Sequence, residues 1–434
     1  MKSHGLMRRV IAGMGANSFG VAITIGTQLA SLPLFLSKWD TATYGVWLML
    51  SALPGYLSMA DVGMVTAAGN RMTMAMGANS PRDANLVFHS AQVFMTLVCS
   101  LLALLILPLI WWFPWFEAAN TDQRLALIAL CVGVLVAFFG GLSEQVFKAT
   151  NRYALGTLLG NVTRLSEWCG WLAGLLLSGS FTAVAMGGLL LRAAGTVLCV
   201  ALARGDSQGL TWGYRHASLS TVRALVRPAI GFMAFPMANA LSFQGVTLLV
   251  GGLLGPSAVA MFNTYRTLAR TVVQVTGLFS YALWPEFSRL FGQGAHRALQ
   301  HLAWRSAWMS TVQAILVSGS LFALAPWILK FWTHDRIPFD PVVLGILMAY
   351  AAIGGIWHVP KVLLMATNQH GALAIWSLVF GAVCVGLAAL FGRPMQLPGV
   401  SSAMLVSEAL IALVCSALAW RSLSDIRLHH GASA

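Results

Sequence analysis

Long runs of apolar residues alternate with short polar segments along almost the whole chain. A helix needs about 20 apolar residues to cross the hydrocarbon core of a bilayer, so this pattern predicts about twelve transmembrane helices. The expected fold class is therefore an all-α polytopic membrane protein. The predicted spans are residues 10–36, 43–68, 86–113, 124–148, 154–178, 182–203, 229–252, 258–284, 302–328, 342–366, 371–392 and 399–420.

One connection is longer than the others. The polar and basic segment 204–228 divides the chain into two halves of about six spans each. Inside this segment, Leu219, Val222, Leu225 and Val226 recur at helical spacing, which predicts a short amphipathic helix on the cytoplasmic membrane surface. The predicted organisation is an N-terminal six-helix bundle at 1–203, a cytoplasmic linker at 204–228, a C-terminal six-helix bundle at 229–420 and a cytoplasmic tail at 421–434.

The composition excludes several classes of protein. Of the 434 residues, 58% are hydrophobic and only 9% are charged, whereas a soluble domain carries roughly a quarter charged residues. So few charges cannot coat the surface of a soluble protein of this size. A soluble enzyme, a disordered chain and a disulfide-rich scaffold are all excluded.

The formal net charge of +13 is best explained by membrane topology. Cytoplasmic loops of inner-membrane proteins collect Lys and Arg, and most of the basic residues lie on one side if both termini are cytoplasmic. The outer loops then hold only Lys38, Arg124, Lys330, Arg336 and Arg393. The excess of basic residues therefore indicates orientation in the membrane, and no nucleic-acid partner is expected.

A weak internal repeat supports the division into halves. Residues 28–43 align without gaps on residues 244–259. In both segments a polar residue, Gln28 or Gln244, is followed by an apolar run and then by a short outer loop. Because six is an even number, two such halves have the same orientation, and parallel repeats around a central site are a recurring plan of transporters.

The predicted span 258–284 carries the sharpest chemical signal. Its polar side chains step by three or four residues and share one helical face; they are Asn263, Arg266, Thr267, Arg270 and Gln274. Two arginines one turn apart repel each other unless something anionic lies opposite, and the planar guanidinium group suits phosphate. Two interpretations stay open here: an anion-binding cavity, or pairing with a carboxylate of a neighbouring helix such as Asp61 or Glu408.

Other polar residues inside spans add weaker candidates. Asn17 and Gln28 lie on a polar stripe of the first span, which is either a helix–helix contact or the wall of a cavity. Arg192 lies mid-span without a local partner and is a second candidate for the cavity. Arg164 and Glu167, three residues apart, are expected to neutralise each other.

The second span combines a helix breaker with an unpaired acid. Pro54-Gly55 interrupts it near its middle, which predicts a kink there. Asp61 and, in the last span, Glu408 have no partner nearby in the sequence, so both are candidates for carrying a coupling proton or sodium ion.

The chain contains no signature of an enzyme or of a metal site. It has no phosphate-binding loop, no GxSxG or HExxH motif and no long cytoplasmic segment. The six cysteines all lie in apolar runs without metal-ligand spacing. We therefore expect no catalytic residue, no metal and no cofactor.

Several motifs resemble those of a known family. The pattern Gln28…Pro33-Leu-Phe-Leu…Tyr44-Gly-Val-Trp-Leu…Asp61-Val-Gly63…Asn70-Arg71 is similar to the opening of polysaccharide flippases of the Wzx type. Their seventh-to-eighth span signature resembles Leu254-Gly-Pro-Ser-Ala-Val-Ala-Met-Phe-Asn-Thr-Tyr-Arg266 followed by Leu283-Trp-Pro285-Glu-Phe-Ser288. These flippases share a superfamily with the multidrug and toxin extrusion (MATE) transporters and the lipid II flippases.

The resemblance implies two six-helix bundles around a central cavity and transport by alternating access. The implied cargo is an undecaprenyl-pyrophosphate-linked oligosaccharide, which moves from the cytoplasmic to the periplasmic leaflet of a bacterial inner membrane for O-antigen, capsule or exopolysaccharide synthesis. Arg266 and Arg270 fall on the span whose arginines are thought to meet the anionic head group in the family. The implied partners are this lipid-linked glycan, membrane lipids, and polysaccharide polymerase and chain-length proteins.

Three other functions were weighed. A lipid II flippase shares the scaffold but usually has two further spans. A cation-coupled multidrug exporter would favour acidic residues in the first and seventh spans, which contain none. A membrane-embedded glycosyltransferase or ligase would want a large periplasmic loop, and the predicted outer loops are short.

Overall fold

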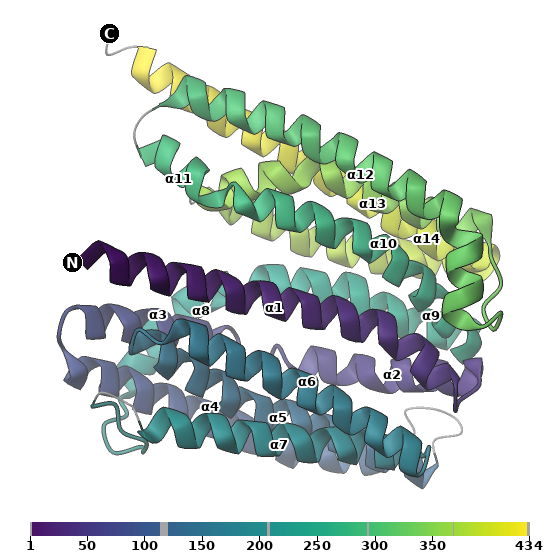
Figure 1. Ribbon diagram of the computed structural model, residues 1–434, viewed down its shortest axis with the longest axis horizontal. Helices are drawn as coiled ribbons and strands as arrows, with labels where there is room; N and C mark the ends of the chain where they lie inside the picture. The colour runs from purple at the N-terminus through teal and green to yellow at the C-terminus, as the bar shows by residue number, and fades with distance from the viewer. Residues whose placement is uncertain (1, 113–119, 206–208, 293–294, 368, 432–434) are drawn as a thin grey trace. The chain divides into compact units, whose positions relative to one another are not determined.

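A computed structural model describes residues 2–112, 120–205, 209–292, 295–367 and 369–431, and these residues contain helices and no β-strand (Figure 1). The all-α fold class is thereby confirmed. Residues 206–208 of the predicted linker and 432–434 of the predicted tail lie outside the described ranges. The helices are α1 (Lys2–Leu36), α2 (Thr41–Leu57), α3 (Met64–Gly77), α4 (Pro81–Trp112), α5 (Thr121–Ala149), α6 (Tyr153–Leu177), α7 (Phe181–Gly205), α8 (Leu219–Ala240), the π-helix η1 (Leu241–Gly245), α9 (Val246–Leu254), α10 (Pro256–Ala282), α11 (Trp284–Gly292), α12 (His296–Thr333), α13 (Pro341–Ala366) and α14 (Gly371–Gly431).

The predicted spans fall largely on helical structure, and the span 43–68 is interrupted at residues 58–63. Among the described residues, 8 helical stretches are long and apolar enough to cross a membrane. The last of them, Gly371–Ser424, covers two predicted spans. Its helix α14 contains Gln396 with φ 50° and ψ −138°, between Pro394 and Pro398, so the chain turns where the sequence predicts the outer loop between two spans.

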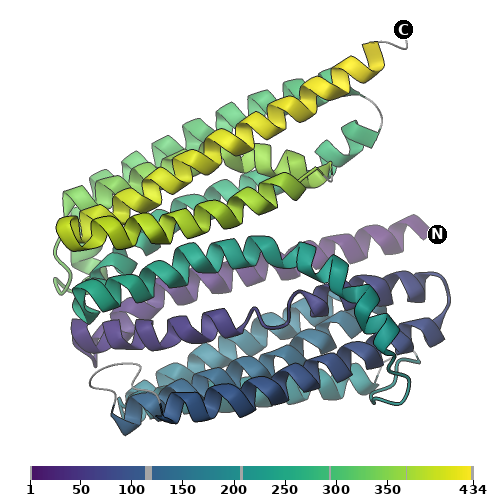
Figure 2. The same cartoon turned by 180° about the vertical axis from the view of Figure 1, so that it is seen from behind.

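The chain divides into two compact units. The first contains Met1–Trp39 and Leu50–Met233, and the second contains Asp40–Met49 and Ala234–Ala434. Within each unit the helices run side by side along their lengths (Figures 1 and 2). Helix α2 therefore contributes its first residues to the second unit, while the predicted boundaries of the two membrane bundles stay a prediction.

Small residues allow α6 and α7 of the first unit to pack backbone to backbone. A Cβ atom on Gly170 would lie 2.2 Å from the carbonyl oxygen of Gly187, and one on Gly174 would lie 2.1 Å from that of Ala183. Membrane helices associate through such small-residue contacts because hydrocarbon offers no hydrophobic driving force between helices. The Gly170-x-x-x-Gly174 spacing thus fixes how α7, which carries Arg192, lies against α6.

Residues of the predicted linker are held against α4 in the first unit. The side chain of Asn85 donates to the carbonyl of Gly209 at 2.7 Å and accepts the N–H of Thr211 at 2.8 Å. His89 contacts the carbonyl of Thr211 at 2.8 Å through Nε2 and accepts the N–H of His216 at 3.1 Å through Nδ1. The amphipathic helix predicted near Leu219 is present, but it continues without a break into the following span as α8.

The second span contains a break that the sequence pattern did not predict. Helix α2 passes through Pro54 and Gly55 and ends at Leu57, and the kink expected at this pair stays a prediction. In the turn between α2 and α3, the backbone is left-handed at Val62, with φ 50°, and at Gly63, with φ 74°. There Asp61 Oδ1 accepts the N–H of Gly63 at 3.0 Å, which makes this acid part of a turn between α2 and α3.

The second unit is built around α13, which packs against α10, α12 and α14. Ser310 on α12 donates to the carbonyl of Gly355 on α13 at 2.9 Å, and a Cβ atom on Gly355 would meet Ala314 at 2.4 Å. At the other side of the unit, α9 ends at Leu254 and α10 begins at Pro256. In the sequence alignment of the predicted repeat, these helix ends correspond to the end of α1 and the start of α2. The observed bounds of the four helices agree with this correspondence.

Candidate functional site

Arg266 on α10 is buried inside the second unit, with only 2% of its surface exposed. Its Nη1 donates to the carbonyl of Phe243 at 2.9 Å, and its Nη2 donates to Thr247 Oγ1 at 2.6 Å and to Asn263 Oδ1. The guanidinium group also lies over the Phe243 ring, with Cζ 3.6 Å from the centroid. A fully buried cation is thus held by uncharged acceptors and a ring face.

The π-helix η1 supplies the main-chain acceptor for this arginine. The five residues Leu241–Gly245 form a wider turn between α8 and α9, and Phe243 is at its centre. The Phe243 carbonyl accepts from both the Thr247 hydroxyl, at 2.8 Å, and Arg266. Single π-helical turns inside helices are frequent at functional sites because they release backbone groups from the regular ladder.

Arg270 lies one turn further along α10 and is less buried than Arg266. Its Cζ lies 4.8 Å from the centroid of the same Phe243 ring. Tyr350 on α13 is close enough to interact electrostatically with both arginines. Across the described residues, neither arginine forms a salt bridge with a carboxylate, so pairing with Asp61 or Glu408, the second interpretation of the sequence, is not observed.

Glu408 on α14 and Lys361 on α13 extend the polar interior of the second unit. Glu408 Oε1 accepts the indole N–H of Trp357 at 2.7 Å. Lys361 Nζ lies 5.3 Å from the centroid of the Trp357 ring and 5.6 Å from that of Phe235. Trp357 therefore contacts both Glu408 and Lys361, and the donor to the Glu408 carboxylate is a neutral indole N–H.

The other predicted positions on α10 frame the arginines. Asn263 uses its Nδ2 to donate to the carbonyl of Val259 at 3.0 Å, so its Oδ1 faces Arg266. Gln274 is half-buried two turns after Arg266. The predicted shared face is thereby present, because Asn263 and Arg266 contact each other directly.

A second charged cluster lies inside the first unit. Arg192 on α7 forms a salt bridge with Glu167 on α6, and Arg164 donates to Asn161 Oδ1. The expectation that Arg164 and Glu167 neutralise each other is therefore wrong, because the carboxylate of Glu167 is taken by a residue 25 positions away. Asn161 in turn donates to the carbonyl of Ala16 on α1 at 2.8 Å.

A polar cavity of about 270 Å³ opens beside this cluster. Glu144 on α5 lines it together with Arg164, Arg192 and Thr163. Gly160 leaves the room that the Glu144 side chain occupies, since a Cβ atom there would lie 2.1 Å from Glu144 Oε1. The cavity is bordered by both signs of charge, and in the described residues no His, Cys, Asp and Glu group has the arrangement of a metal site.

The polar stripe of α1 is partly used for contacts between helices. Ser31 Oγ accepts the indole N–H of Trp168 on α6 at 2.8 Å. Asn17 Oδ1 accepts the hydroxyl of Tyr153 at 3.2 Å, and the Asn17 side chain is exposed. Gln28 is half-buried on the same helix. The helix–helix interpretation thus accounts for Ser31 and Asn17.

The fold brings together two groups of residues that are not among the candidate site residues of the sequence. Glu144 on α5 and Thr163 on α6 line the cavity beside Arg192 on α7, so three consecutive helices contribute to it. In the second unit, the Phe243 ring lies beside both arginines and Tyr350 interacts with them electrostatically, although Tyr350 lies in an apolar run of the sequence. An aromatic residue in an apolar run carries no distinguishing signal until its neighbours are known.

The arrangement of helices is that of a known class of membrane transporter. A multidrug resistance MATE family transporter of the MOP superfamily, in an inward-facing conformation, matches with a TM-score of 0.78 at 12% identity, over 92% of this chain and 95% of the other. A multidrug resistance MATE family transporter of the MOP superfamily in an outward-facing conformation matches with a TM-score of 0.66 at 12% identity, over 96% of each chain.

A MOP superfamily transporter from Pyrococcus furiosus, described by the reverse polarity of its binding pocket, matches with a TM-score of 0.65 at 12% identity over 96% of each chain. No family model and no curated protein matches the sequence. At this identity the likeness establishes the fold, which is the twelve-helix, two-bundle fold of MATE transporters.

Proposed function

We propose that this protein is a flippase for polyprenyl-pyrophosphate-linked oligosaccharides, and that it works by alternating access in the inner membrane of a bacterium with both termini in the cytoplasm. The observation that carries the proposal is the arginine pair on α10. Arg266 is held in place by uncharged acceptors, and Arg270 stands one turn away without a carboxylate partner among the described residues. Two cationic groups fixed in this way suit an anionic ligand.

The division of labour between the two arginines follows from their contacts. Arg266 donates its Nη hydrogen bonds to Phe243, Thr247 and Asn263. It therefore holds α10 against η1 and supplies a positive electrostatic potential there. Among the described residues Arg270 lies over the Phe243 ring and has no hydrogen bond or ion pair, so its guanidinium donors are the ones left for a phosphate oxygen. A preorganised cationic site lowers the cost of taking a pyrophosphate out of water.

A second candidate function is export of small organic molecules, because two of the matching structures are described as multidrug resistance transporters. Organic cations would require an acidic site, and Glu408 in the second unit and Glu144 in the first are acids for which the structure shows no salt bridge among the described residues. Polarity of the binding pocket is also what the description of the Pyrococcus furiosus protein connects with a different function. The arginine pair favours the anionic cargo.

The experiment that tests the proposal is lipid analysis of a strain lacking this gene. We expect a polyprenyl-pyrophosphate-linked oligosaccharide to accumulate on the cytoplasmic side, and the wild-type gene to reverse the accumulation. The mass of the accumulated lipid would identify the cargo. Complementation with Arg270→Gln, at equal protein abundance, is expected to leave the lipid accumulated.

Two results would contradict the proposal. Accumulation of lipid II would assign the protein to peptidoglycan synthesis on the same scaffold. Normal lipid-linked intermediates, together with increased sensitivity of the strain to cationic drugs, would favour the exporter. Coupling of transport to a proton or sodium gradient, through Asp61 or Glu408, is a separate proposal that ion-gradient collapse in vesicles would test.

A further inference from the structure

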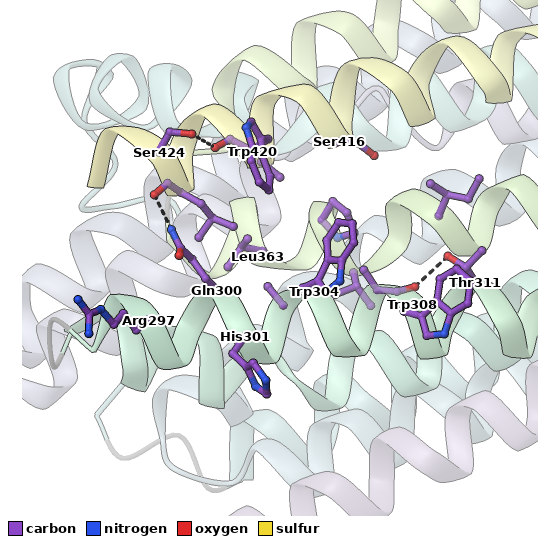
Figure 3. Close-up of a pocket in the computed structure, with 17 residues that line it drawn as sticks. Arg297, Gln300, His301, Trp304, Trp308, Thr311, Leu363, Ser416, Trp420 and Ser424 are labelled. Carbon is purple, nitrogen blue, oxygen red and sulfur yellow. Dashed lines mark hydrogen bonds between the residues drawn. The ribbon is translucent and has the colours of Figure 1, made fainter. Parts of the chain in front are cut away.

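A large apolar groove lies on the second unit between α12, α13 and α14. Its volume is about 820 Å³, and apolar side chains form most of its wall. Figure 3 shows Trp304 and Trp308 on α12 and Trp420 on α14 around it, with Leu363 of α13 at its floor. A cavity of this size is in the range of sites that hold sizeable ligands, and its lining disfavours water.

The tryptophans of the groove are unusually exposed. Trp304, Trp308 and Trp420 expose 71%, 67% and 67% of their surface, and none of the three indole N–H groups has an acceptor within the described part of the chain. Pro360 at the groove also lacks an N–H, so the carbonyl of Ile356 has no helical donor. Tryptophan concentrates at membrane interfaces, where its ring meets hydrocarbon and its N–H meets polar lipid groups.

One end of the groove is polar and cationic. Arg297, Gln300 and Ser424 lie together at this end (Figure 3). Gln300 donates to the carbonyl of Leu423 at 3.0 Å, which ties α12 to α14 there. Arg297 is exposed and has no hydrogen bond or ion pair to any described residue, so its charge is available to a ligand.

The length of the groove matches one leaflet of a bilayer. From Arg297 to Trp308 along α12 the rise is roughly 16 Å, and half of the hydrocarbon core is about 15 Å. A charged group at one end and apolar walls over the remaining length complement a molecule with an anionic head and a long hydrocarbon chain. A water-soluble ligand would match only the first of these features.

We infer that this groove binds a diacyl phospholipid with an anionic head group, which places its phosphate at Arg297 and an acyl chain along Trp304, Trp308 and Trp420. Basic pockets between membrane helices recognise anionic lipid head groups in this way. The inference is independent of the proposed cargo, because the arginine pair lies on α10 whereas the groove is formed by α12, α13 and α14.

Helix α13 contributes both to the wall of the groove and to the polar interior of the second unit. Ile356, Val359, Pro360 and Leu363 line the groove, whereas Trp357 of the same helix contacts Glu408. Two sides of one helix therefore carry the lipid groove and the Glu408 contact. Lipid occupancy is expected to stabilise α13 and the helices that pack against it.

Native mass spectrometry of the full-length protein, released from detergent with phosphatidylglycerol or phosphatidylethanolamine added, tests the inference. We expect phosphatidylglycerol to bind more tightly than phosphatidylethanolamine. Arg297→Gln is expected to weaken phosphatidylglycerol about fivefold, since a basic residue near an anionic lipid surface contributes about that factor. The double variant Trp304→Ala/Trp308→Ala is expected to weaken both lipids.

Matched controls come from the same helix. Arg305 and Trp327 are exposed on α12 but do not line the groove, so Arg305→Gln and Trp327→Ala should bind both lipids as the wild type does. Equal loss in the control and groove variants, or equal binding of the two lipids, would overturn the inference. Displacement of phosphatidylglycerol by equimolar undecaprenyl phosphate would also overturn it, and would assign the groove to a polyprenyl chain. A dimer that is lost only in the tryptophan variant would overturn it as well, and would assign the groove to a second copy of this chain.

Discussion

Arg192 on α7 pairs with Glu167 on α6 across the closely packed interface of these helices. Both side chains retain some exposure, 22% for Arg192 and 16% for Glu167. The contact depends on the glycine residues that bring α6 and α7 together, since Gly170 and Gly187 meet backbone to backbone nearby. The pair therefore belongs to the packing of the first unit as well as to its polar cavity.

Removing one member of this pair is expected to destabilise the first unit. Arg192→Gln leaves the Glu167 carboxylate without its cation, and Glu167→Gln does the reverse. Loss of one partner from a buried pair costs about 3 kcal/mol, and the partial exposure reduces that figure here. The measurement is the midpoint of thermal unfolding in detergent.

The double variant Arg192→Gln/Glu167→Gln separates pairing from packing. If the ion pair matters, the double variant should be more stable than the sum of the two single changes predicts, by about 1 kcal/mol or more. Strictly additive changes in stability would show that the two charged side chains act independently of each other. Their presence would then be explained by the polar cavity beside them and not by their pairing.

The two arginines of α10 are expected to respond differently to the same change. Arg266→Gln removes three hydrogen bonds, to Phe243, Thr247 and Asn263, inside the unit, and each hydrogen bond to a charged group is worth roughly 1.5–3 kcal/mol. We therefore expect a marked fall in membrane abundance. Arg270→Gln loses a ring contact only, so abundance should hold while transport is lost.

Immunoblotting of membrane fractions and the lipid assay, run on the same cultures, distinguish these outcomes. Thr267→Val, on the same helix between the two arginines, is the matched control, because its hydroxyl donates only to the carbonyl of Asn263 one turn earlier. If Arg266→Gln were abundant but inactive, Arg266 itself would be assigned to the ligand. An active Arg270→Gln would remove Arg270 from the mechanism.

Asp40 provides a test outside the spans, in the short connection between α1 and α2. Its Oδ1 accepts the N–H of Thr43 at 2.7 Å, which caps the start of α2. The hydrogen bonds from Thr43 hold the pKa of Asp40 below its usual range. Asp40→Ala should therefore cost about 1 kcal/mol at neutral pH, measured by thermal unfolding.

The pH dependence of this cap has a defined sign. Because the pKa of Asp40 is lowered in the folded protein, its stabilising effect is complete above the ordinary pKa of aspartate and is lost as the pH falls through the lowered value. The stability difference between wild type and Asp40→Ala should thus be constant from pH 7 to about 5 and shrink below about 4. Asp40→Asn keeps a capping oxygen and should lose this dependence, and a difference that grows on acidification would contradict the assignment.

Hydropathy and turn chemistry predicted most of the fold. Runs of about 20 apolar residues are a strong signal because a membrane helix must satisfy its own backbone, and the turn at Gln396 lies between the predicted spans 371–392 and 399–420. The position of the break after α2 was missed. Proline is tolerated inside membrane helices, and α2 continues past Pro54 to Leu57 before a turn that includes the left-handed residues Val62 and Gly63 leads into α3.

Partners of the charged residues could not be predicted from the sequence. The face shared by Asn263 and Arg266 followed from helical periodicity, and the contact between them is present. The carbonyl of Phe243 became an acceptor only through a π-helical turn, which has no reliable sequence signature. Likewise, the choice of Arg192 over Arg164 by Glu167 depends on how α6 and α7 pack, a property of tertiary structure alone.

Gly45 in α2 allows the sharpest test of packing in the second unit. A Cβ atom at this position would lie 1.8 Å from the carbonyl oxygen of Pro256, at the start of α10. Backbone cannot move aside as a side chain can, so Gly45→Ala should separate the two helix ends. It should lower the free energy of unfolding by several kcal/mol and severely reduce the amount of folded protein.

Two glycines of α9 give a graded comparison. A Cβ atom on Gly251 meets the flexible end of Met49 at 2.4 Å, and one on Gly252 meets nothing within 4 Å. Gly251→Ala should therefore be mildly destabilising, and Gly252→Ala neutral or stabilising by up to about 1 kcal/mol, as alanine is the better helix former. Fluorescence-detected size-exclusion chromatography of the three variants checks this order, and a Gly45→Ala protein as abundant and monodisperse as Gly252→Ala would show that α2 and α10 do not approach so closely in the membrane.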